Sequence, residues 1–331
     1  MKRIAVLSSG GDCPGLNPAI RAVVRSAISY GFEVWGVRRG YEGLINDDFE
    51  ELDARSVGGI IGHGGTFLMT ARSKRFLEEH YRTEALRNLH RRGIDALVVI
   101  GGNGSLTGAA VFSKKFPLVG IPGSIDNDVY GTDMAIGVDT ALNTVLDAID
   151  KIRDTASSHQ RAFLVETMGR ESGYLALASG LGGGAEAILI PEKEMSMEEV
   201  ADLMHMAYEE GKSHFLAVVA EGWKPGTAAL ANYLRERQNY VEFKIRVTVL
   251  GHVQRGGVPS AFDRLLATRM GARAVEFVRE GKFGQMVGLQ GGKLVAVPLE
   301  KVASERKKLN LEYYYIARRM EQYCLSDAEC G

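Results

Sequence analysis

The sequence predicts an α/β fold with largely parallel sheets, and three observations support this prediction. Short apolar runs without polar–apolar alternation are typical of strands that are buried on both faces of a parallel sheet. Most of these runs end in a glycine-rich turn and lead into a helical pattern, so strand, turn and helix alternate along nearly the whole chain. The length of 331 residues corresponds to about two domains.

Two successive strands carry the most informative turns. The apolar runs Leu97–Ile100 and Pro117–Ile121 end in the turns Gly101–Ser105 and Pro122–Asp128. Ligands of parallel sheets bind beyond the carboxyl ends of the strands, so we expect both turns to border one crevice. The first turn offers backbone N–H groups without side chains in the way, and a helix is expected to start at Ser105. This combination predicts a phosphate cradle.

The second turn supplies two carboxylates, Asp126 and Asp128. In an irregular turn the two need not share a face, so one can accept a proton from a hydroxyl group while the other holds a metal ion. A phosphate cradle beside a base and a magnesium ligand is typical of a phosphotransferase. Either turn alone is as well explained by a simple strand-to-helix connection. Both together, on successive strands, favour a functional site.

The start of the chain repeats the pattern. The strand Ile4–Leu7 is followed by a turn in which Gly11 allows a second close approach of a phosphate, although the Gly-x-Gly-x-x-Gly fingerprint of dinucleotide-binding proteins is absent. Tyr41 either stacks on a base or packs in the core. Arg72 follows the glycine-rich turn Gly62–Thr66, which raises the odds that it binds a phosphate.

The remaining elements follow from the same patterns. The other expected strands are Glu33–Val37, Ala162–Val165, Ala187–Ile190, Phe215–Ala220, Thr248–Leu250 and Leu294–Val297. The expected helices are Ala19–Ser29, Phe76–Arg92, Ala135–Asp154, Ser196–Glu210, Arg264–Arg279 and, after the basic segment Glu305–Lys308, the tyrosine-rich Leu311–Tyr323. The aromatic side chains of this last helix are expected to pack against the body of the protein.

Charged residues stand at or near the ends of several later strands. Each one alone is better explained by a surface ion pair. Arginine suits the bidentate capture of a phosphoryl group and glutamate suits sugar hydroxyls, so together they suggest an anionic polyol substrate. These residues are Arg161, Arg170, Glu221, Arg246, His252 and Arg255.

Composition excludes several classes of protein. The net charge is −1, so no basic excess points to nucleic acid or to an anionic membrane. No apolar run approaches membrane-spanning length, and the first is too short for a signal peptide. The cysteine count is odd and includes no Cys-x-x-Cys pair, so neither a disulfide framework nor a zinc site is indicated, and a cytoplasmic location is expected: Cys13, Cys324 and Cys330.

Longer motifs identify a family resemblance. The sequence resembles 6-phosphofructokinase of the bacterial ATP-dependent type over nearly the whole chain, through the motifs Gly65–Leu68 with Ala71-Arg72, Pro122–Asp128, Asp154–Arg161, Met168–Arg170 and Gly251–Gly257. The resemblance implies a glycolytic kinase with two Rossmann-like α/β domains and an active site in the cleft between them. It assigns residues 1–137 and about 252–302 to a nucleotide-binding domain, and residues 138–251 and about 303–331 to a sugar-phosphate-binding domain.

The resemblance also implies the role of each site residue. Asp126 would be the base that takes the proton of the sugar 1-hydroxyl group, with Ser124 beside it and with Asp128 and Asn103 near Mg²⁺. Arg72 would also steady the transferring phosphoryl group. ATP would bind to Gly11, Tyr41, Arg72, Ser73, Gly102, Asn103, Gly104, Ser105 and Gly108. Fructose 6-phosphate would bind to Ser124, Asp126, Asp128, Arg161, Met168, Gly169, Arg170, Glu221, Arg246, His252 and Arg255. Arg161 and Arg246 would reach in from a neighbouring subunit of a homo-oligomer, usually a homotetramer.

The phosphoryl donor is argued from two small residues. Relatives that use pyrophosphate carry Asp and Lys at the positions of Gly104 and Gly123. Glycine leaves room for the ribose and α-phosphate of ATP, whereas the larger side chains would fill it, so we expect ATP as the donor.

Two departures from the family pattern modify these expectations. Asn103 stands where the family usually has Asp, so one charge near the metal is lost and reduced activity or an altered metal or nucleotide preference is expected. The resemblance also implies a second site, which binds anionic effectors in the family. This site is only partly kept, because Ala54, Glu210 and Ser213 replace expected cations. Weak regulation by ADP or phosphoenolpyruvate follows from this loss. The effector residues that match the family are Arg21, Arg25, Arg153, Glu186 and Lys212, and Arg55 stands next to Ala54 as a candidate for the missing cation.

Other readings stay open at this stage. Within the kinase class, pyrophosphate as donor or another ketose phosphate as acceptor is possible. A non-catalytic regulatory paralogue is suggested only by Asn103, and a nicotinamide dehydrogenase only by the glycine-rich α/β pattern. No nucleic-acid or membrane partner is expected.

Overall fold

The computed structural model describes residues 2–320. The chain forms two compact units, each built from two separate segments. The large unit comprises the described residues up to Thr140 together with Arg255–Lys307, and the small unit comprises Ala141–Gln254 and the described residues from Lys308 onward. The resemblance had placed these boundaries at residues 137, 251 and about 302.

A seven-stranded sheet forms the centre of the large unit, in the order β11-β10-β5-β4-β1-β2-β3. The pairs β2–β3 and β10–β11 are antiparallel and the other neighbours are parallel. The central strands are buried along their whole length, as their unbroken apolar runs predict. The strands are β1 (Arg3–Ser9), β2 (Glu33–Val37), β3 (Phe49–Leu52), β4 (Ala96–Gly101), β5 (Leu118–Pro122), β10 (Gln285–Gln290) and β11 (Lys293–Pro298).

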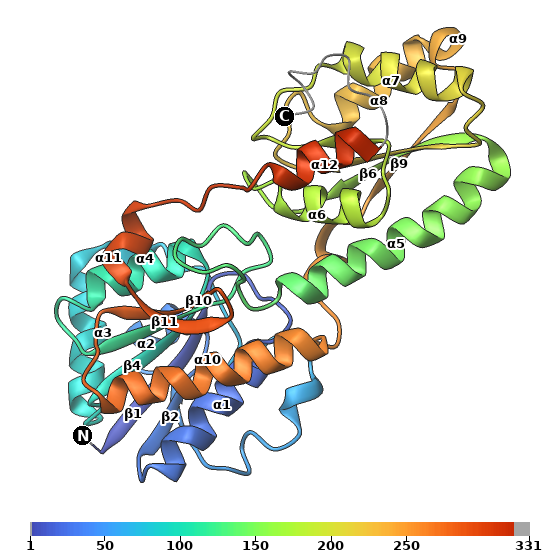
Figure 1. Cartoon of the computed structure of the whole chain (residues 1–331). Coiled ribbons are helices and arrows are strands. Elements are labelled where there is room, and N and C mark those ends of the chain that lie inside the picture. The colour runs from blue at the N-terminus through green and yellow to red at the C-terminus, as the bar shows by residue number, and fades with distance from the viewer. Residues whose placement is uncertain (1, 321–331) are drawn as a thin grey trace. The chain divides into compact units, whose positions relative to one another are not determined.

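Helices cover both faces of this sheet (Figure 1). Helices α1 (Leu16–Ser29) and α10 (Ala261–Arg279) pack against each other on one side. On the other side, a hydrophobic core joins the sheet to α2, α3, α4 and α11. These four helices are α2 (Gly40–Ile45), α3 (Glu79–Arg91), α4 (Asn103–Phe112) and α11 (Leu299–Ser304), and short 3-10 turns occur at η1 (Ile60–Gly62) and η2 (Arg75–Leu77).

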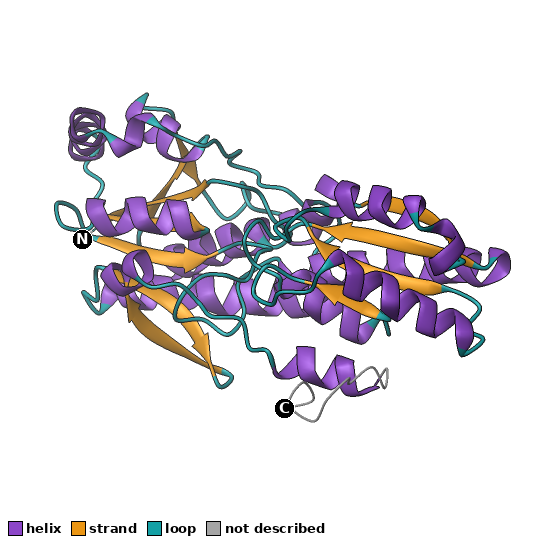
Figure 2. Ribbon diagram, turned by 90° about the horizontal axis from the view of Figure 1, so that it is seen from above, coloured by secondary structure: helices purple, strands orange, loops and turns teal. Residues whose placement is uncertain are grey.

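The small unit is built around a four-stranded parallel sheet in the order β7-β8-β6-β9. Helices lie beside its strands (Figure 2). Its strands are β6 (Arg161–Thr167), β7 (Ala187–Leu189), β8 (Phe215–Ala220) and β9 (Lys244–Val249). Its helices are α6 (Tyr174–Gly182), α7 (Met197–Glu209), α8 (Thr227–Glu236), α9 (Gln238–Val241) and α12 (Glu312–Met320). Helix α5 (Val138–His159) and the 3-10 turn η3 (Gly251–Arg255) run from one unit into the other along the chain.

Several boundaries differ from those that the sequence predicts. Helix α4 begins at Asn103, two residues before Ser105, and α5 begins at Val138 and continues to His159. Strand β9 runs over Lys244–Val249 and leaves out Leu250, which the prediction had included. In α12 the prediction that aromatic residues pack against the body is confirmed, because Tyr314 is buried in the core of the small unit. Tyr323, the predicted end of this helix, lies outside the described residues.

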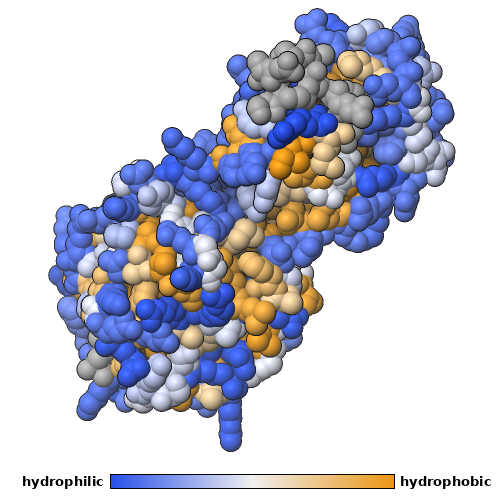
Figure 3. All heavy atoms as spheres, in the orientation of Figure 1, coloured by the Kyte–Doolittle hydropathy of each residue, from blue (hydrophilic) through white to orange (hydrophobic). Residues whose placement is uncertain are grey.

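The surface of the large unit is not uniformly polar. Figure 3 shows apolar side chains among the hydrophilic ones, and exposed residues near the start of α10 include Val258, Phe262 and Leu265. Within residues 2–320, no helix combines the length and apolar character needed to cross a membrane.

Candidate active site

Three strands of the large sheet end at the same level. The register pairs Ser9 of β1 with Gly101 of β4, and Gly101 with Pro122 of β5. The turns that follow β1, β4 and β5 therefore lie side by side at the carboxyl edge of the sheet. The prediction that the two glycine-rich turns border the same place is confirmed, and the turn around Gly11 joins them.

The turn after β4 has the geometry of a phosphate cradle. Helix α4 begins at Asn103, and its N-cap, Gly102, is extended and supplies no capping side chain. The backbone N–H groups of the first helical turn thus point outward without a side-chain partner, which favours an anion at this end of the helix. A β-carbon on Gly101 would lie 2.5 Å from the Ser9 carbonyl oxygen, so only glycine permits the neighbouring turns to approach this closely.

The segment that carries Arg72 lies against the first turn. The Gly10 amide donates to the Ala71 carbonyl oxygen at 3.4 Å, and Thr70 Oγ1 donates to the Gly10 carbonyl oxygen at 3.0 Å. The next residue, Arg72, is exposed, while the hydroxyl of Ser73 accepts a hydrogen bond from the Phe76 amide at 3.1 Å. Arg72 therefore lies beside the turn that follows β1.

Of the two predicted alternatives for Tyr41, stacking on a base or packing in the core, the structure shows packing in the core. Its side chain is only 4% exposed, and its ring stacks on Phe76 with the centroids 3.8 Å apart. Its hydroxyl donates to the Ser105 carbonyl oxygen at 2.6 Å, in the first turn of α4. Burial of this phenol raises its pKa far above the usual range, so it acts as a hydrogen-bond donor. Base stacking by Tyr41 is not available, because its ring is part of the core beneath the cradle next to Gly108.

The loop after β5 holds the candidate base. Asp126 is 5% exposed, and its backbone amide donates to Ser124 Oγ at 3.2 Å. The Ser124 amide donates to the Ile136 carbonyl oxygen at 3.1 Å, which closes the loop on the segment before α5. A carboxylate shielded in this way works in a place from which water is largely excluded.

Asn103 and Asp128 meet next to this loop. The side-chain amide of Asn103 donates to the backbone carbonyl oxygen of Asp128 at 3.2 Å. Its other side-chain atom, Oδ1, is buried and has no hydrogen-bond partner. An aspartate in this position could accept hydrogen bonds but could not donate one to a carbonyl. The substitution therefore replaces a carboxylate with a link to the base-bearing loop.

The residues fit a magnesium ion that is held mainly by its substrate. Within the described part of the chain no group of three or more His, Cys, Asp or Glu side chains could enclose a metal ion. Magnesium in phosphotransferases keeps several waters and binds through one or two protein oxygens plus substrate phosphates. One half-buried carboxylate, Asp128, and the buried Oδ1 of Asn103 meet that modest requirement.

In the small unit the turn after β6 is held by two side chains. Glu221 Oε1 accepts from the Gly169 amide at 3.2 Å and from the Arg170 amide at 2.7 Å. Gln254 Oε1 accepts from the Met168 amide at 3.2 Å. Sequence reasoning did not single out Gln254, which is fully buried. Its only signal was its place in the motif Gly251–Gly257.

Arg161 and Arg246 lie away from this turn in their own chain. Arg161 begins β6, whereas Met168 follows its end. At about 3.3 Å per residue, the two are roughly 23 Å apart. Arg246 pairs in register with Phe163, near the same end of the sheet as Arg161. Neither arginine therefore joins Met168 and the residues that hold its turn within one small unit.

His252 and Arg255, two other predicted contacts of the sugar phosphate, lie in different surroundings. His252 is exposed in the η3 turn. Arg255 is only 9% exposed, and its Nη1 atom donates to the Asp12 carbonyl oxygen at 2.9 Å. A β-carbon on Gly11 would collide with this guanidinium group. Arg255 thus lies against the turn after β1, together with the phosphate-approach residues of the large unit.

The predicted effector residues form two groups. In the small unit, Glu186 Oε1 pairs with Lys212 Nζ at 3.4 Å, and Arg153 reaches the Gly184 carbonyl oxygen at 3.5 Å. In the large unit, Arg25 donates to the Ala54 carbonyl oxygen at 3.2 Å, and the remaining two residues are Arg21 and Arg55.

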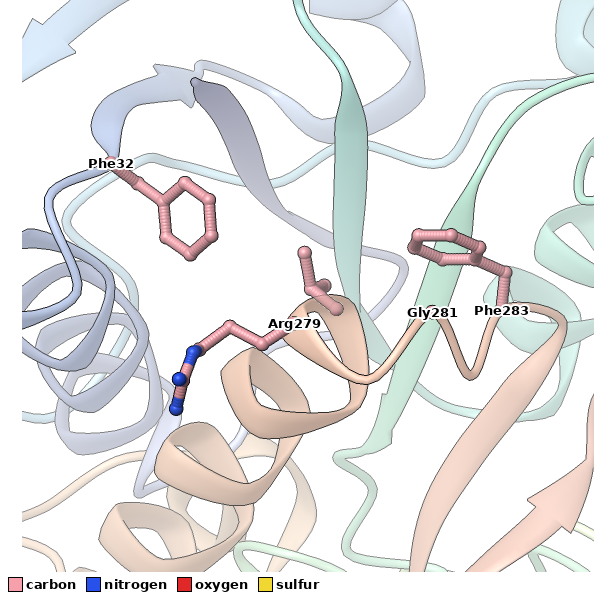
Figure 4. A pocket seen from close by; sticks show the side chains of 5 residues that line it. Phe32, Arg279, Gly281 and Phe283 are labelled. Carbon is pink, nitrogen blue, oxygen red and sulfur yellow. The ribbon is translucent and has the colours of Figure 1, made fainter. Parts of the chain in front are cut away.

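A surface cavity lies at the opposite edge of the large sheet. It has a volume of about 310 Å³ and is lined by Phe32, Val278, Arg279, Gly281 and Phe283 (Figure 4). Phe32 precedes β2 and Phe283 precedes β10, so the cavity lies at the amino ends of these strands. It is separate from the cradle and from the base-bearing loop, which lie at the carboxyl ends.

Comparison with known proteins gives a consistent result. A sequence profile of the phosphofructokinase family matches residues 3–278. The ATP-dependent 6-phosphofructokinase of Listeria welshimeri is 50% identical over 318 residues, which cover 96% of this chain and 98% of the relative. That of Bacillus cytotoxicus is 51% identical over 322 residues, which cover 97% and 99%.

Solved structures show the same likeness. Phosphofructokinase from Saccharomyces cerevisiae is 36% identical with a TM-score of 0.85, and the match covers 100% of this chain and 48% of that one. A pyrophosphate-dependent phosphofructokinase from Marinobacter aquaeolei has the same TM-score of 0.85 at 22% identity, and the match covers 95% and 86%. The second likeness shows a shared fold only.

Proposed function

The chain belongs to the phosphofructokinase family, and on that premise we propose that it transfers the γ-phosphoryl group of ATP to fructose 6-phosphate. The product is fructose 1,6-bisphosphate, which makes the protein a kinase of glycolysis. One observation carries most of the proposal: the Gly101–Ser105 cradle and the loop with Asp126 follow neighbouring, in-register strands. A phosphate donor and a hydroxyl acceptor can thus meet within one edge of a rigid sheet.

Asp126 serves as the general base. Its carboxylate accepts the proton of the sugar 1-hydroxyl group as that oxygen attacks the γ-phosphorus atom and the bond to the ADP oxygen breaks. The proton ends on the carboxylate, and ADP leaves with the bridging electron pair. Ser124, whose hydroxyl already bonds to the Asp126 amide, keeps the base-bearing loop in one conformation.

The large unit holds ATP. The free N–H groups at the start of α4 bind phosphate oxygens, and the open space beside Gly104 leaves room for the nucleotide, while Gly11 lets Arg255 pack against the turn after β1. Arg72 steadies the transferring phosphoryl group through its guanidinium. Tyr41 supports the phosphate cradle from the core, where its hydroxyl donates a hydrogen bond to the Ser105 carbonyl oxygen. The other nucleotide contacts are Ser73, Gly102, Asn103 and Gly108.

Mg²⁺ accompanies ATP and is held by Asp128 and by Asn103 Oδ1. When bound, the ion neutralises charge on the donor phosphates. With one carboxylate fewer than the family pattern, the protein requires more magnesium for half-maximal activity.

The small unit binds fructose 6-phosphate. Met168, Gly169 and Arg170 present a turn that Glu221 and Gln254 hold rigid. His252 adds a further polar contact to the sugar phosphate, and Arg255 of the large unit approaches it from the turn after β1.

We further propose a homotetramer in which Arg161 and Arg246 act on a neighbouring subunit's substrate. Their distance from Met168 within one chain supports this arrangement. The exposed apolar side chains of Val249, Val258 and Leu265 suit a subunit interface. We also propose a cytoplasmic location, two domains with separate binding roles, and weak control by anionic effectors.

A coupled assay tests the whole proposal. Purified protein is given ATP or pyrophosphate as donor, and fructose 6-phosphate or other ketose phosphates as acceptor. Turnover with ATP and fructose 6-phosphate well above all other pairs is the expected result. Preference for pyrophosphate or for another ketose phosphate would replace the donor or acceptor. No turnover with any pair would favour a regulatory paralogue that only binds these ligands.

A further inference from the structure

The basic segment before helix α12 contains one lysine that turns inward. Of the residues in Glu305–Lys308, only Lys307 is half-buried, whereas its neighbours Arg306 and Lys308 are exposed. A run of charges is normally a solvated surface, so the inward position of one member needs a reason. The reason lies in what its ammonium group contacts.

Lys307 contacts the far end of the base-bearing loop. Its Nζ atom donates to the backbone carbonyl oxygen of Asp133 at 2.6 Å. The two residues are 174 positions apart in the sequence, so this is a tertiary contact. Both belong to the large unit, and Lys307 is the last residue of that unit before the chain continues into the small unit.

The Asp133 carbonyl oxygen is also hydrogen-bonded to the part of the loop that carries Asp126. Asn127 Nδ2 also donates to the Asp133 carbonyl oxygen, at 3.2 Å, while Asn127 Oδ1 accepts from the Ala135 amide at 3.1 Å. Asn127 stands between Asp126 and Asp128 and has a left-handed backbone with φ of 49°. Asparagine adopts the left-handed conformation more readily than most residues, and the two side-chain hydrogen bonds of Asn127 hold it there.

Asp133 itself is anchored to a strand hairpin. Its amide donates to the Leu289 carbonyl oxygen at 2.7 Å, and its carboxylate accepts from the Gly291 amide at 2.8 Å. The loop is therefore fixed at Asp133 by β10 and the turn after it. Lys307 adds a cation to this fixed point, and the acidic groups facing it are the carboxylates of Asp133 and Asp128. Partial burial lowers the pKa of Lys307 to about 8.

We propose that Lys307 is a positioning residue for phosphoryl transfer, which acts by clamping the Asp133 carbonyl and, through Asn127, the backbone that aims Asp126. The role rests on the proposed function of Asp126. Lys307 touches neither the sugar nor the nucleotide in this scheme. Its removal therefore lowers the rate of the chemical step and leaves substrate binding almost unchanged.

The test compares Lys307→Met with the matched control Lys308→Met. Methionine keeps the length of the side chain and removes the donor and the charge. We expect kcat of K307M to fall about 10- to 100-fold, with KM for both substrates within about twofold of the parent. K308M should match the parent, and Lys307→Arg, which keeps a cationic donor, should recover most of the lost rate.

A second measurement reports on the loop without activity. Hydrogen exchange of the amides of residues 126–135 should speed up about tenfold or more in K307M, whereas the amides of the central strands should not change. This readout separates the two proposals. If the parent protein does not phosphorylate fructose 6-phosphate, the proposed function fails, and exchange still decides whether the clamp exists.

Four results would overturn the proposal. The first is a K307M protein with kcat within about twofold of the parent. The second is an equal loss of rate in K308M. The third is a K307M protein that does not fold, since a clamp on one loop should lower Tm by less than about 10 °C. Unchanged exchange at residues 126–135 would also contradict it.

Discussion

The two units hold their site residues in different ways. In the large unit, the turns after β1, β4 and β5 each have a backbone carbonyl that accepts from a side chain of another element: Arg255 to Asp12, Tyr41 to Ser105, Asn103 to Asp128 and Lys307 to Asp133. In the small unit one turn is held by Glu221 and Gln254, while Arg170, Arg246 and His252 are exposed. In the proposed function, the unit that would perform the chemistry is preorganised, and the unit that would capture an anion presents exposed side chains.

This difference follows from what each half must do. Phosphoryl transfer depends on alignment to within fractions of an ångström, so freedom in the donor cradle or in the base costs rate directly. Capture of a phosphate by arginine tolerates more motion, because the guanidinium group has several equivalent donors and long-range charge. Substitutions in the large unit should therefore affect mainly kcat, and those in the small unit mainly KM.

The largest effect is expected at Asp126. Asp126→Ser removes the base and should lower kcat about 10²- to 10⁴-fold, while calorimetry still detects fructose 6-phosphate and ATP. Asp150→Ser, which removes an exposed carboxylate of α5, serves as the control and should keep parental activity. A loss of less than tenfold in the Asp126 variant would mean that another group takes the proton.

Arg246→Ala tests the opposite side of the comparison. Removing one charged contact to the sugar phosphate should raise KM for fructose 6-phosphate about 10- to 100-fold, with kcat nearly constant. At fructose 6-phosphate concentrations well below the KM of this variant, mixing it with Asp126→Ser after subunit exchange should raise activity, because a hybrid site can combine an intact base with an intact arginine from the neighbouring subunit. Mixtures no more active than their components would show that the arginine serves its own chain.

A smaller effect is expected at the departure from the family pattern. Asn103→Asp restores a carboxylate near the metal and should lower the magnesium concentration for half-maximal activity about three- to tenfold. It also removes the hydrogen bond to the Asp128 carbonyl, so kcat should fall slightly even at saturating magnesium. Titration of activity and of nucleotide binding with MgCl₂ checks both effects, and superimposable curves for variant and parent would refute a metal role.

The smallest effect concerns a structural contact of the large unit. Arg92, which hydrogen-bonds to Asp47, holds the pKa of that carboxyl below its usual value. The unfolded chain then binds more protons near pH 4, so this contribution to the free energy of unfolding is present above about pH 4 and is lost as the pH falls below it. Asp47→Asn should remove this contribution to the free energy of unfolding, which is less than about 1 kcal/mol. The acid side of a plot of Tm against pH should therefore become flatter, and KM and kcat should not change. An unaltered acid slope would contradict the assignment.

The sequence predicts the site well where chemistry is carried by the backbone. Unbroken apolar runs that end in small-residue turns identify β4 and β5, and parallel pairing then brings their turns together, so the position of the Gly101–Ser105 turn beside the loop with Asp126 follows from pattern alone. The role of Asp126 as base is implied only by the family resemblance. The exact start of α4 does not, because Gly102, Asn103 and Gly104 have weak helix propensity and the tertiary contact of Asn103 decides.

Contacts between side chains that are far apart in the sequence could not be predicted from the sequence pattern. For Tyr41 the sequence allows stacking on a base, although a position in the core is commoner, and the stacking of its ring on Phe76 shows that it lies in the core. Lys307 looks like any member of a charged run, and its partner lies 174 residues away. Strand β10 was missed because its six residues are bounded by glutamines and interrupted by Gly288, and its place beside β5 is set by long-range pairing.

The split composition of the large unit has a consequence for biosynthesis. Its sheet accepts β10 beside β5, and α10 covers α1, yet both elements are translated only after Ala141–Gln254. A nascent chain therefore emerges from the ribosome with the apolar side of α1 bare until the whole intervening segment has been made. We expect truncated products that stop before α10 to aggregate or to bind chaperones.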